Sequence, residues 1–190
     1  ISMTLTQLPA LQVILPLIAA PVCLLLRSGR LAWLLSILVS TTALIIAVLL
    51  LRLVLENGTV SYTYGGWAAP WGIEYRVDIA SAFVLAIVAG ISTVVLLFSR
   101  VGASWEIKSS EQSLFYTAYL LCLTGLLGMT ATGDAFNLFV FLEISSLSSY
   151  VLIAMGPDRR GLTAAYQYLI MGTIGATFIL IAVGLLYMVT

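Results

Sequence analysis

The sequence has very little charge. Charged residues make up 8% of its 190 residues and hydrophobic residues 62%, and the formal net charge is zero. This composition excludes an ordinary soluble domain. Zero net charge without a basic patch gives no support for nucleic-acid binding. The chain is therefore predicted to be an all-α, polytopic transmembrane protein in contact with the lipid bilayer.

Histidine is absent and cysteine is scarce. Cys23 and Cys122 both lie inside apolar segments, where we expect them to pack as small side chains. Haem, iron–sulfur and zinc sites therefore have no ligand set, and no metal or cofactor is expected. The N-terminus has no positively charged region before its apolar stretch, because Arg27 and Arg30 follow that stretch. It is interpreted as a retained first span and not as a signal peptide.

Six apolar segments are long enough to cross a membrane as helices of a single transmembrane domain. They cover approximately residues 8–26, 31–55, 79–99, 113–131, 135–155 and 162–189. Pro16 is expected to kink the first span. Gly125, Gly128, Gly172 and Gly175 are expected to let helices approach closely.

Residues 57–78 form a long connection rich in glycine and aromatic residues. Trp67, Trp71 and Tyr75 suit a membrane–water interface. The glycines predict a compact, turn-rich cap over one end of the helices.

Charge placement predicts the orientation of the chain. The connections after the first, third and fifth spans hold six basic residues, whereas the opposite side holds two, Arg52 and Arg76. By the positive-inside rule the odd connections face the cytoplasm and the N-terminus lies outside a plasma (inner) membrane. The six basic residues are Arg27, Arg30, Arg100, Lys108, Arg159 and Arg160.

Glu143 is the main candidate for chemistry, because it lies in the middle of the span 135–155. It is eight residues into that helix, or roughly 12 Å at about 1.5 Å per residue, near the midplane of a hydrocarbon core about 30 Å thick. A carboxylate there costs several kcal/mol unless it is protonated, paired or wetted, which favours a role in proton transfer. The alternative is a structural glutamate that ties two helices together.

Other polar residues could extend such a site. Asp134 is placed to cap the fifth helix or to form an entry, and Asn137 follows one turn later. Ser146 and Tyr150 follow Glu143 along its helix, and the sixth span adds a weak polar stripe. This stripe comprises Tyr166, Thr173 and Thr177, and Gln167 lies next to it in the sequence. The stripe is either a hydration path or a set of interhelical hydrogen bonds.

The segment from Gly133 to Tyr150, GDAFNLFVFLEISSLSSY, closely resembles the fifth transmembrane helix of the antiporter-like proton-translocating subunits. The best match within this family is the D-type subunit of Mrp-type multisubunit Na⁺/H⁺ antiporters. The family also includes subunits of membrane-bound hydrogenases and respiratory complex I. Residues 65–78 and 162–187 are similar to the segment before the third helix and to the sixth helix of the same family.

The resemblance implies a fold of about fourteen helices, of which this chain would supply the first six. It maps the key glutamate of the family onto Glu143 and places its lysine partner beyond Thr190. A lysine common in the sixth helix is replaced by Gln167. The chain would then be a fragment or the represented part of a longer protein, or else a natural six-helix protein that lacks a complete proton path.

Two functions follow from the resemblance. The first is a secondary-transport subunit that exchanges protons for sodium or another monovalent cation, together with other membrane subunits. The second is a proton-pumping subunit of a complex I-type NADH:quinone oxidoreductase or a membrane-bound hydrogenase. In that case the chain itself would bind no redox cofactor and would not be the redox enzyme.

Overall fold

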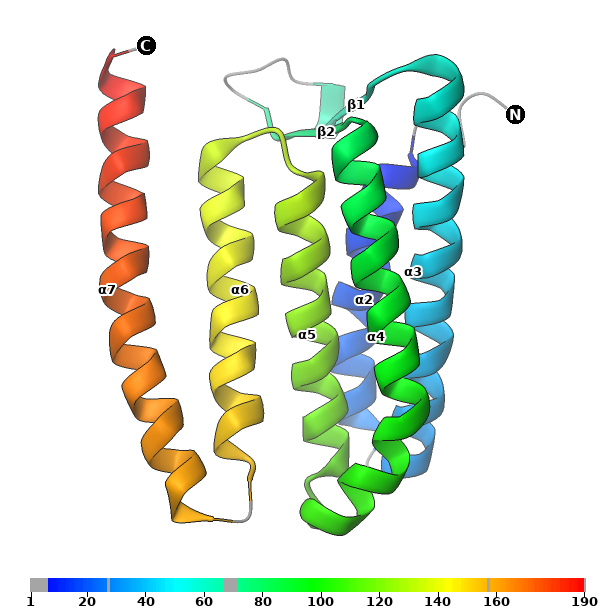
Figure 1. Cartoon of the computed structure of the whole chain (residues 1–190), viewed down its shortest axis with the longest axis vertical. Helices are drawn as coiled ribbons and strands as arrows, with labels where there is room; N and C mark the ends of the chain where they lie inside the picture. Colours follow the sequence, from blue (N-terminus) through cyan, green and yellow to red (C-terminus); the bar gives the residue numbers. More distant parts are fainter. Residues whose placement is uncertain (1–6, 27, 67–71, 157, 190) are drawn as a thin grey trace.

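The computed structural model describes residues 7–26, 28–66, 72–156 and 158–189. These residues include six helices that are long and apolar enough to cross a membrane (Figure 1), which confirms the predicted fold class. The helices are α2 (Leu8–Leu25), α3 (Gly29–Asn57), α4 (Ile79–Glu106), α5 (Gln112–Ala131), α6 (Ala135–Ala154) and α7 (Arg159–Val189).

Three helices extend beyond the expected spans. Helix α4 continues past Ser99 to Glu106, α3 begins at Gly29, and α7 begins at Arg159. The expected limits followed the loss of hydrophobicity, which marks the edge of the lipid. A helix satisfies its backbone groups internally and can continue into water. The added turns of α4 carry charged and aromatic side chains beyond the apolar run.

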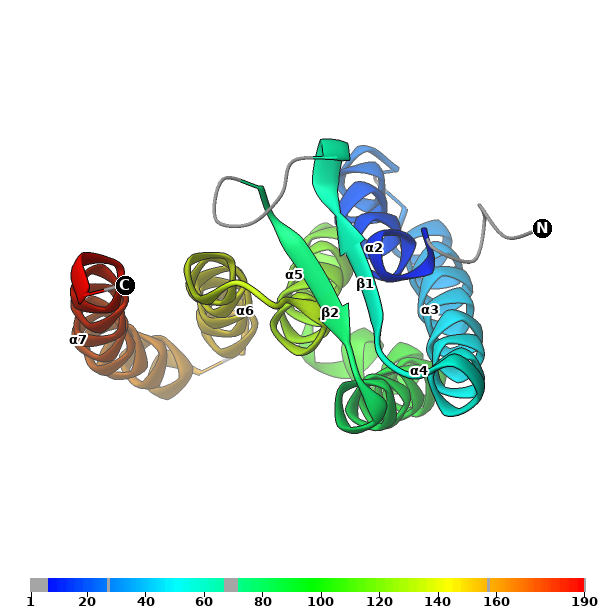
Figure 2. The same cartoon turned by 90° about the horizontal axis from the view of Figure 1, so that it is seen from above.

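Helix α5 is the centre of the bundle. It packs against α2, α3, α4 and α6, and its Leu120 and Leu127 are fully buried. Helix α6 lies between α5 and α7 (Figures 1 and 2), and α7 has its main contact with α6. Consequently most of the surface of α7 is exposed in this chain.

The connection after α3 contains a β-hairpin, which sequence analysis did not predict. Strands β1 (Val60–Thr63) and β2 (Glu74–Val77) are antiparallel, with Val60 opposite Val77. Seen from above, the hairpin crosses the helix ends (Figure 2). Val60–Thr63 is too short for its alternation of more and less buried side chains to stand out among the surrounding glycines. Of these glycines, Gly65 and Gly66 have positive φ angles of 63° and 75°. Trp67 and Trp71 lie outside the described residues.

Tyr75 corrects a second expectation. It is buried, with 3% of its surface exposed, and does not face the lipid headgroups. Its ring contacts Tyr64 edge-on at a centroid distance of 5.2 Å and lies 6.3 Å from Phe141 of α6. Burial raises the pKa of Tyr75 well above its ordinary value. Tyr75 therefore holds the hairpin on the bundle.

Hydroxyl groups join the helices across the bundle. The Ser40 hydroxyl of α3 donates to the Ser92 hydroxyl of α4 at 3.1 Å. The Tyr119 hydroxyl of α5 donates to the Ser92 carbonyl at 3.2 Å. In a lipid bilayer, apolar contact alone does little to favour one helix pairing over another. Directional hydrogen bonds of this kind add to the packing between specific helices.

Gln12 of α2 is fully buried, and neither polar atom of its amide has a hydrogen-bond partner among the described residues. A buried, unsatisfied amide costs about 1–3 kcal/mol. Gln12→Leu, which keeps a similar volume, is therefore expected to raise the thermal unfolding temperature in detergent. Thr117→Val is the control, because the Thr117 hydroxyl donates to the Ala20 carbonyl and its loss should lower that temperature. A fall in stability for Gln12→Leu would show that the amide makes a favourable interaction.

Candidate functional site: an intramembrane glutamate

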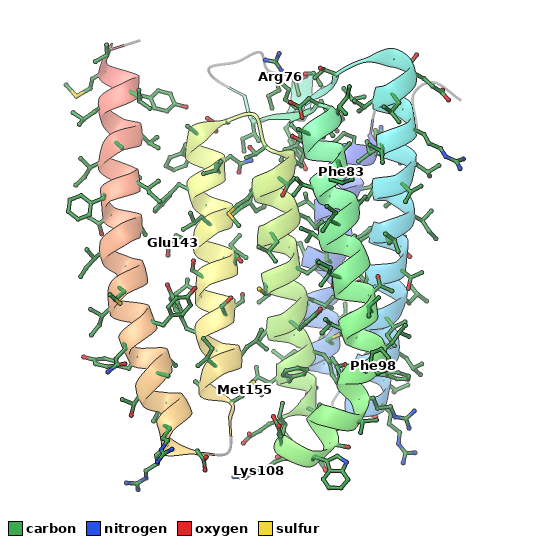
Figure 3. All side chains as sticks on the ribbon, in the orientation of Figure 1. Arg76, Phe83, Phe98, Lys108, Glu143 and Met155 are labelled. Carbon is green, nitrogen blue, oxygen red and sulfur yellow. The ribbon has the colours of Figure 1, made fainter. Side chains whose placement is uncertain are left out.

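Helix α6 carries Glu143 near its midpoint. The helix spans 20 residues, about 30 Å, which matches the thickness of a hydrocarbon core. Glu143 is partly buried, and Figure 3 shows it at mid-height between α6 and α7. Arg76 and Lys108 lie near opposite ends of the molecule in the same view. Glu143 therefore lies far from either end of the bundle.

The Glu143 carboxyl makes no hydrogen bond or ion pair with any residue that the structure describes. A tie between two helices would require such a partner. The group is therefore left for a partner from outside this segment.

The face of α6 toward α5 is used for close packing. A Cβ atom added at Gly125 would lie 2.6 Å from the Ser145 nitrogen, and one added at Gly128 would collide with the Phe141 ring. The Cys122 thiol lies 3.5 Å from the Ser149 hydroxyl. These contacts fix α6 on α5 and leave Glu143 near the α7 side of the helix.

Most serines of α6 have hydrogen-bond partners. The hydroxyls of Ser148 and Ser149 donate to the carbonyls of Ile144 and Ser145, one turn back. Ser146, in contrast, makes no side-chain hydrogen bond within the described residues and is partly buried. Ser146 is therefore the serine with a hydroxyl left for another group.

Tyr150 packs on α7. Its ring lies edge-on to Tyr168 at a centroid distance of 5.1 Å, and its hydroxyl lies against Gly172. The absence of a side chain at Gly172 makes room for this hydroxyl. Gly175, by contrast, has nothing within 4 Å of an added Cβ atom, so the expected close approach at Gly175 does not occur among the described residues.

Asp134 caps α6 and also contacts the far end of α7. Its carboxylate accepts hydrogen bonds from the backbone N–H groups of Phe136 at 3.3 Å and Asn137 at 3.1 Å. The Tyr187 hydroxyl donates to the same carboxylate at 3.0 Å. The Asn137 amide donates to the Thr132 hydroxyl at 3.0 Å. Sequence reasoning missed Tyr187, because no local pattern links residues so far apart in the chain.

The Asp134–Tyr187 contact predicts a graded loss of stability. Tyr187→Phe removes one hydrogen bond and should cost about 1 kcal/mol. Asp134→Ala removes that bond and the helix cap, for about another 1 kcal/mol. Thermal unfolding in detergent measures both, with Tyr166→Phe as the control because Tyr166 is 62% exposed. Equal unfolding temperatures for Tyr187→Phe and the unmodified protein would contradict the contact.

The polar stripe of α7 is not joined to Glu143 by any contact among residues 7–26, 28–66, 72–156 and 158–189. Tyr166, Gln167, Thr173 and Thr177 are all exposed, and the two threonine hydroxyls donate to carbonyls of α7 itself. The buried residues of α7 are instead Ala165, Ala176 and Val183. A hydration path along this stripe therefore needs a covering element from outside the described residues.

No group of three or more histidine, cysteine, aspartate or glutamate residues that could hold a metal ion occurs in the part of the chain that the structure describes. The chemistry available at Glu143 is therefore that of a single carboxyl group and its neighbouring hydroxyls. Proton transfer is within the reach of such a group.

Comparisons with known proteins identify membrane subunits that are similar to this chain. Residues 132–190, which include the whole of α6, match the family described as NADH:quinone oxidoreductase/Mrp antiporter, transmembrane. The chain is 42% identical over 193 residues to the N-type subunit of NADH-quinone oxidoreductase from Desulforudis audaxviator, covering 97% of this chain and 37% of that protein. It is 29% identical over 181 residues to the D-type Na⁺/H⁺ antiporter subunit of Bacillus subtilis, covering 95% and 36%.

Solved structures show the same arrangement of helices. The Mrp complex of Dietzia sp. DQ12-45-1b matches with a TM-score of 0.85 at 26% identity, over 98% of this chain and 35% of that chain. The membrane-bound sulfane sulfur reductase, an archaeal respiratory membrane complex, matches with a TM-score of 0.83 at 30% identity, over 95% and 37%. The chain thus spans a little over a third of the length of these relatives.

Proposed function

We propose that this chain, which belongs to the antiporter-like membrane-subunit family, contributes to proton translocation through the Glu143 carboxyl group. The observation that carries the proposal is a carboxyl group at the middle of α6 with no partner among the described residues. Membrane proteins use such groups in proton relays because their charge is costly and therefore easily switched.

Glu143 would alternate between two states. In one state it is ionised and paired with a cation, and in the other it is protonated and neutral. A nearby cation stabilises the ionised form of a carboxyl group, and an apolar environment stabilises its neutral form. The family resemblance implies that the cation is a lysine beyond Thr190. Ser146, on the same helix, would hydrogen-bond water or the carboxyl group along the route.

Exchange for sodium or another monovalent cation is the coupling that we propose first. The support for it is the similarity to proteins named as antiporter subunits, together with the fold shared with an Mrp complex. The protein would then function with other membrane subunits. The largely exposed surface of α7 is where further helices or subunits would pack.

A second candidate is a proton-pumping membrane subunit of a quinone oxidoreductase. The observation that favours it is the 42% identity to an N-type quinone oxidoreductase subunit, compared with 29% to the antiporter subunit of Bacillus subtilis. The fold match to a respiratory membrane complex agrees with this candidate. In this case the driving force would come from electron transfer in partner subunits.

Proton movement in everted membrane vesicles that contain the complete complex separates the two candidates. Proton movement triggered by added sodium, without an electron donor, is the result expected for the antiporter. Proton movement that needs an electron donor and ignores sodium would assign the chain to the redox-driven class. A vesicle preparation from cells lacking the protein is the control for other transporters.

We also propose a plasma-membrane location with the connections after α2, α4 and α6 in the cytoplasm. Lys108, which follows α4, and Arg76, which precedes it, lie near opposite ends of the bundle (Figure 3). The connections proposed to be cytoplasmic also carry the basic residues Arg30, Arg100, Arg159 and Arg160, so basic residues are in excess on that side. Arg27 lies outside the described residues. Labelling of cysteines introduced at Ser109 and Ser61 by a membrane-impermeant reagent on intact cells tests this orientation.

A further inference from the structure

A basic cavity lies where the first turns of α3 and α5 meet the last turns of α4. Its volume is about 610 Å³, and its polar lining comes from Arg30 of α3, Arg100 and Ser104 of α4, Ser109, and Gln112 and Tyr116 of α5. The described residues that line it include no carboxylate. We propose that this cavity binds the phosphate headgroup of an anionic phospholipid from the adjoining leaflet.

The charge of the cavity fits a phosphate group. Arg30 and Arg100 are both exposed, and neither forms an ion pair with a carboxylate among the described residues. Guanidinium groups bind phosphate through paired, charge-assisted hydrogen bonds. Basic pockets between transmembrane helices are a recurrent binding site for anionic lipid headgroups.

Arg100 is held in position before any ligand binds. Its guanidinium lies 5.0 Å from the ring centroid of Trp33, and the Trp33 indole N–H donates to the Leu96 carbonyl at 2.9 Å. This arrangement fixes the cation on an aromatic face. A cation that is already ordered loses less conformational entropy on binding.

Two helix N-termini open at the same cavity. Gly29 is the first residue of α3 and Gln112 is the first residue of α5. The N-cap residues Ser28 and Glu111 make no side-chain cap hydrogen bond, so they leave backbone N–H groups at these two ends without a side-chain acceptor. The free N–H groups and the helix dipole favour an anion at this position.

Apolar side chains beside the cavity fit a lipid better than free phosphate. Trp105 and Val101 line it and are 87% and 66% exposed, and Phe98 of the same helix is 74% exposed. Figure 3 shows Phe98 in the half of the bundle that ends near Lys108. Aromatic side chains of this kind lie at the membrane interface. A phospholipid would place its phosphate on the arginines and its acyl chains along these residues.

The test is the thermal stability of the complete protein, assembled in its complex, in detergent titrated with lipid. Phosphatidylglycerol is expected to raise the unfolding temperature of the unmodified protein. Arg30→Gln/Arg100→Gln should need about twenty-five-fold more phosphatidylglycerol for the same effect, since each basic residue near an anionic lipid contributes about fivefold in affinity. Arg159→Gln/Arg160→Gln, at the start of α7, is the matched control and should respond like the unmodified protein.

Three results would overturn the proposal. The first is an unchanged phosphatidylglycerol response in the double variant. The second is equal protection by inorganic phosphate, which would indicate a site for a small anion, and the third is equal protection by phosphatidylcholine. If the double variant does not fold, Arg30→Gln alone decides, because the exposed Arg30 has no bonding partner among the described residues. That single variant should weaken the response about fivefold.

Discussion

Glu143→Gln is expected to abolish proton translocation by the assembled complex. Glutamine keeps the size and polarity of the side chain but cannot bind and release a proton. Glu143 makes no hydrogen bond or ion pair among the described residues, so the substitution breaks no such bond there. Replacing a buried ionisable group by a neutral one of the same shape avoids the cost of its charge. Proton movement in everted vesicles, normalised to the amount of assembled complex, is the measurement.

Two variants make this result interpretable. Glu106→Gln removes a carboxylate from the exposed end of α4 and should leave transport unchanged. Glu143→Asp keeps a titratable group in a displaced position and should retain part of the activity. Full transport by Glu143→Gln would remove Glu143 from the proton route. Loss of assembly or stability with normal transport per complex would instead identify Glu143 as a structural tie.

The class of fold could be predicted from the sequence because hydrocarbon imposes a strong length constraint on every span. The midpoint position of Glu143 followed from the same constraint, since one charged residue stands out in an apolar run. The limits of α4 did not follow from it. Hydropathy marks the edge of the lipid, whereas the helix continues through Trp105 to Glu106 and there lines the basic cavity.

Features that depend on tertiary contact could not be predicted. The hairpin is short, and its strand β2 is held by a β-bridge between Tyr75 and Thr132, at the link between α5 and α6. The Gly133 N–H also donates to the Glu74 carbonyl at 2.9 Å. Neither bond has a local sequence signal. They matter for the site because they fix the position at which the helix that carries Glu143 begins.

The polar stripe on α7 shows why helical periodicity is insufficient for a path. Tyr166, Thr173 and Thr177 do share one side of the helix, but that side is exposed, and the side toward α6 carries the small residues Ala165, Gly172 and Ala176. Periodicity gives the face of a helix and not the element that covers it. Whether the stripe carries protons therefore remains a prediction for the complete protein.

Gly125→Ala is expected to separate α6 from α5 and to lower both stability and transport. An added Cβ atom would lie 2.6 Å from the Ser145 nitrogen and 2.7 Å from the Phe141 carbonyl oxygen. Both are backbone atoms of α6, so no side-chain rotation relieves the clash and the helices must move apart. Overpacking of this kind costs about 1–3 kcal/mol. Thermal unfolding in detergent and transport per assembled complex measure the two effects.

Gly102→Ala is the matched control for this experiment. It makes the same chemical change in helix α4, but nothing among the described residues lies within 4 Å of the added Cβ atom. Its effect should be neutral or stabilising by up to about 1 kcal/mol, because alanine loses less backbone entropy in a helix than glycine. If Gly125→Ala were as stable as Gly102→Ala, the close approach of α5 and α6 would be wrong. A stable Gly125→Ala protein with reduced transport would instead show that the position of Glu143 depends on this helix contact.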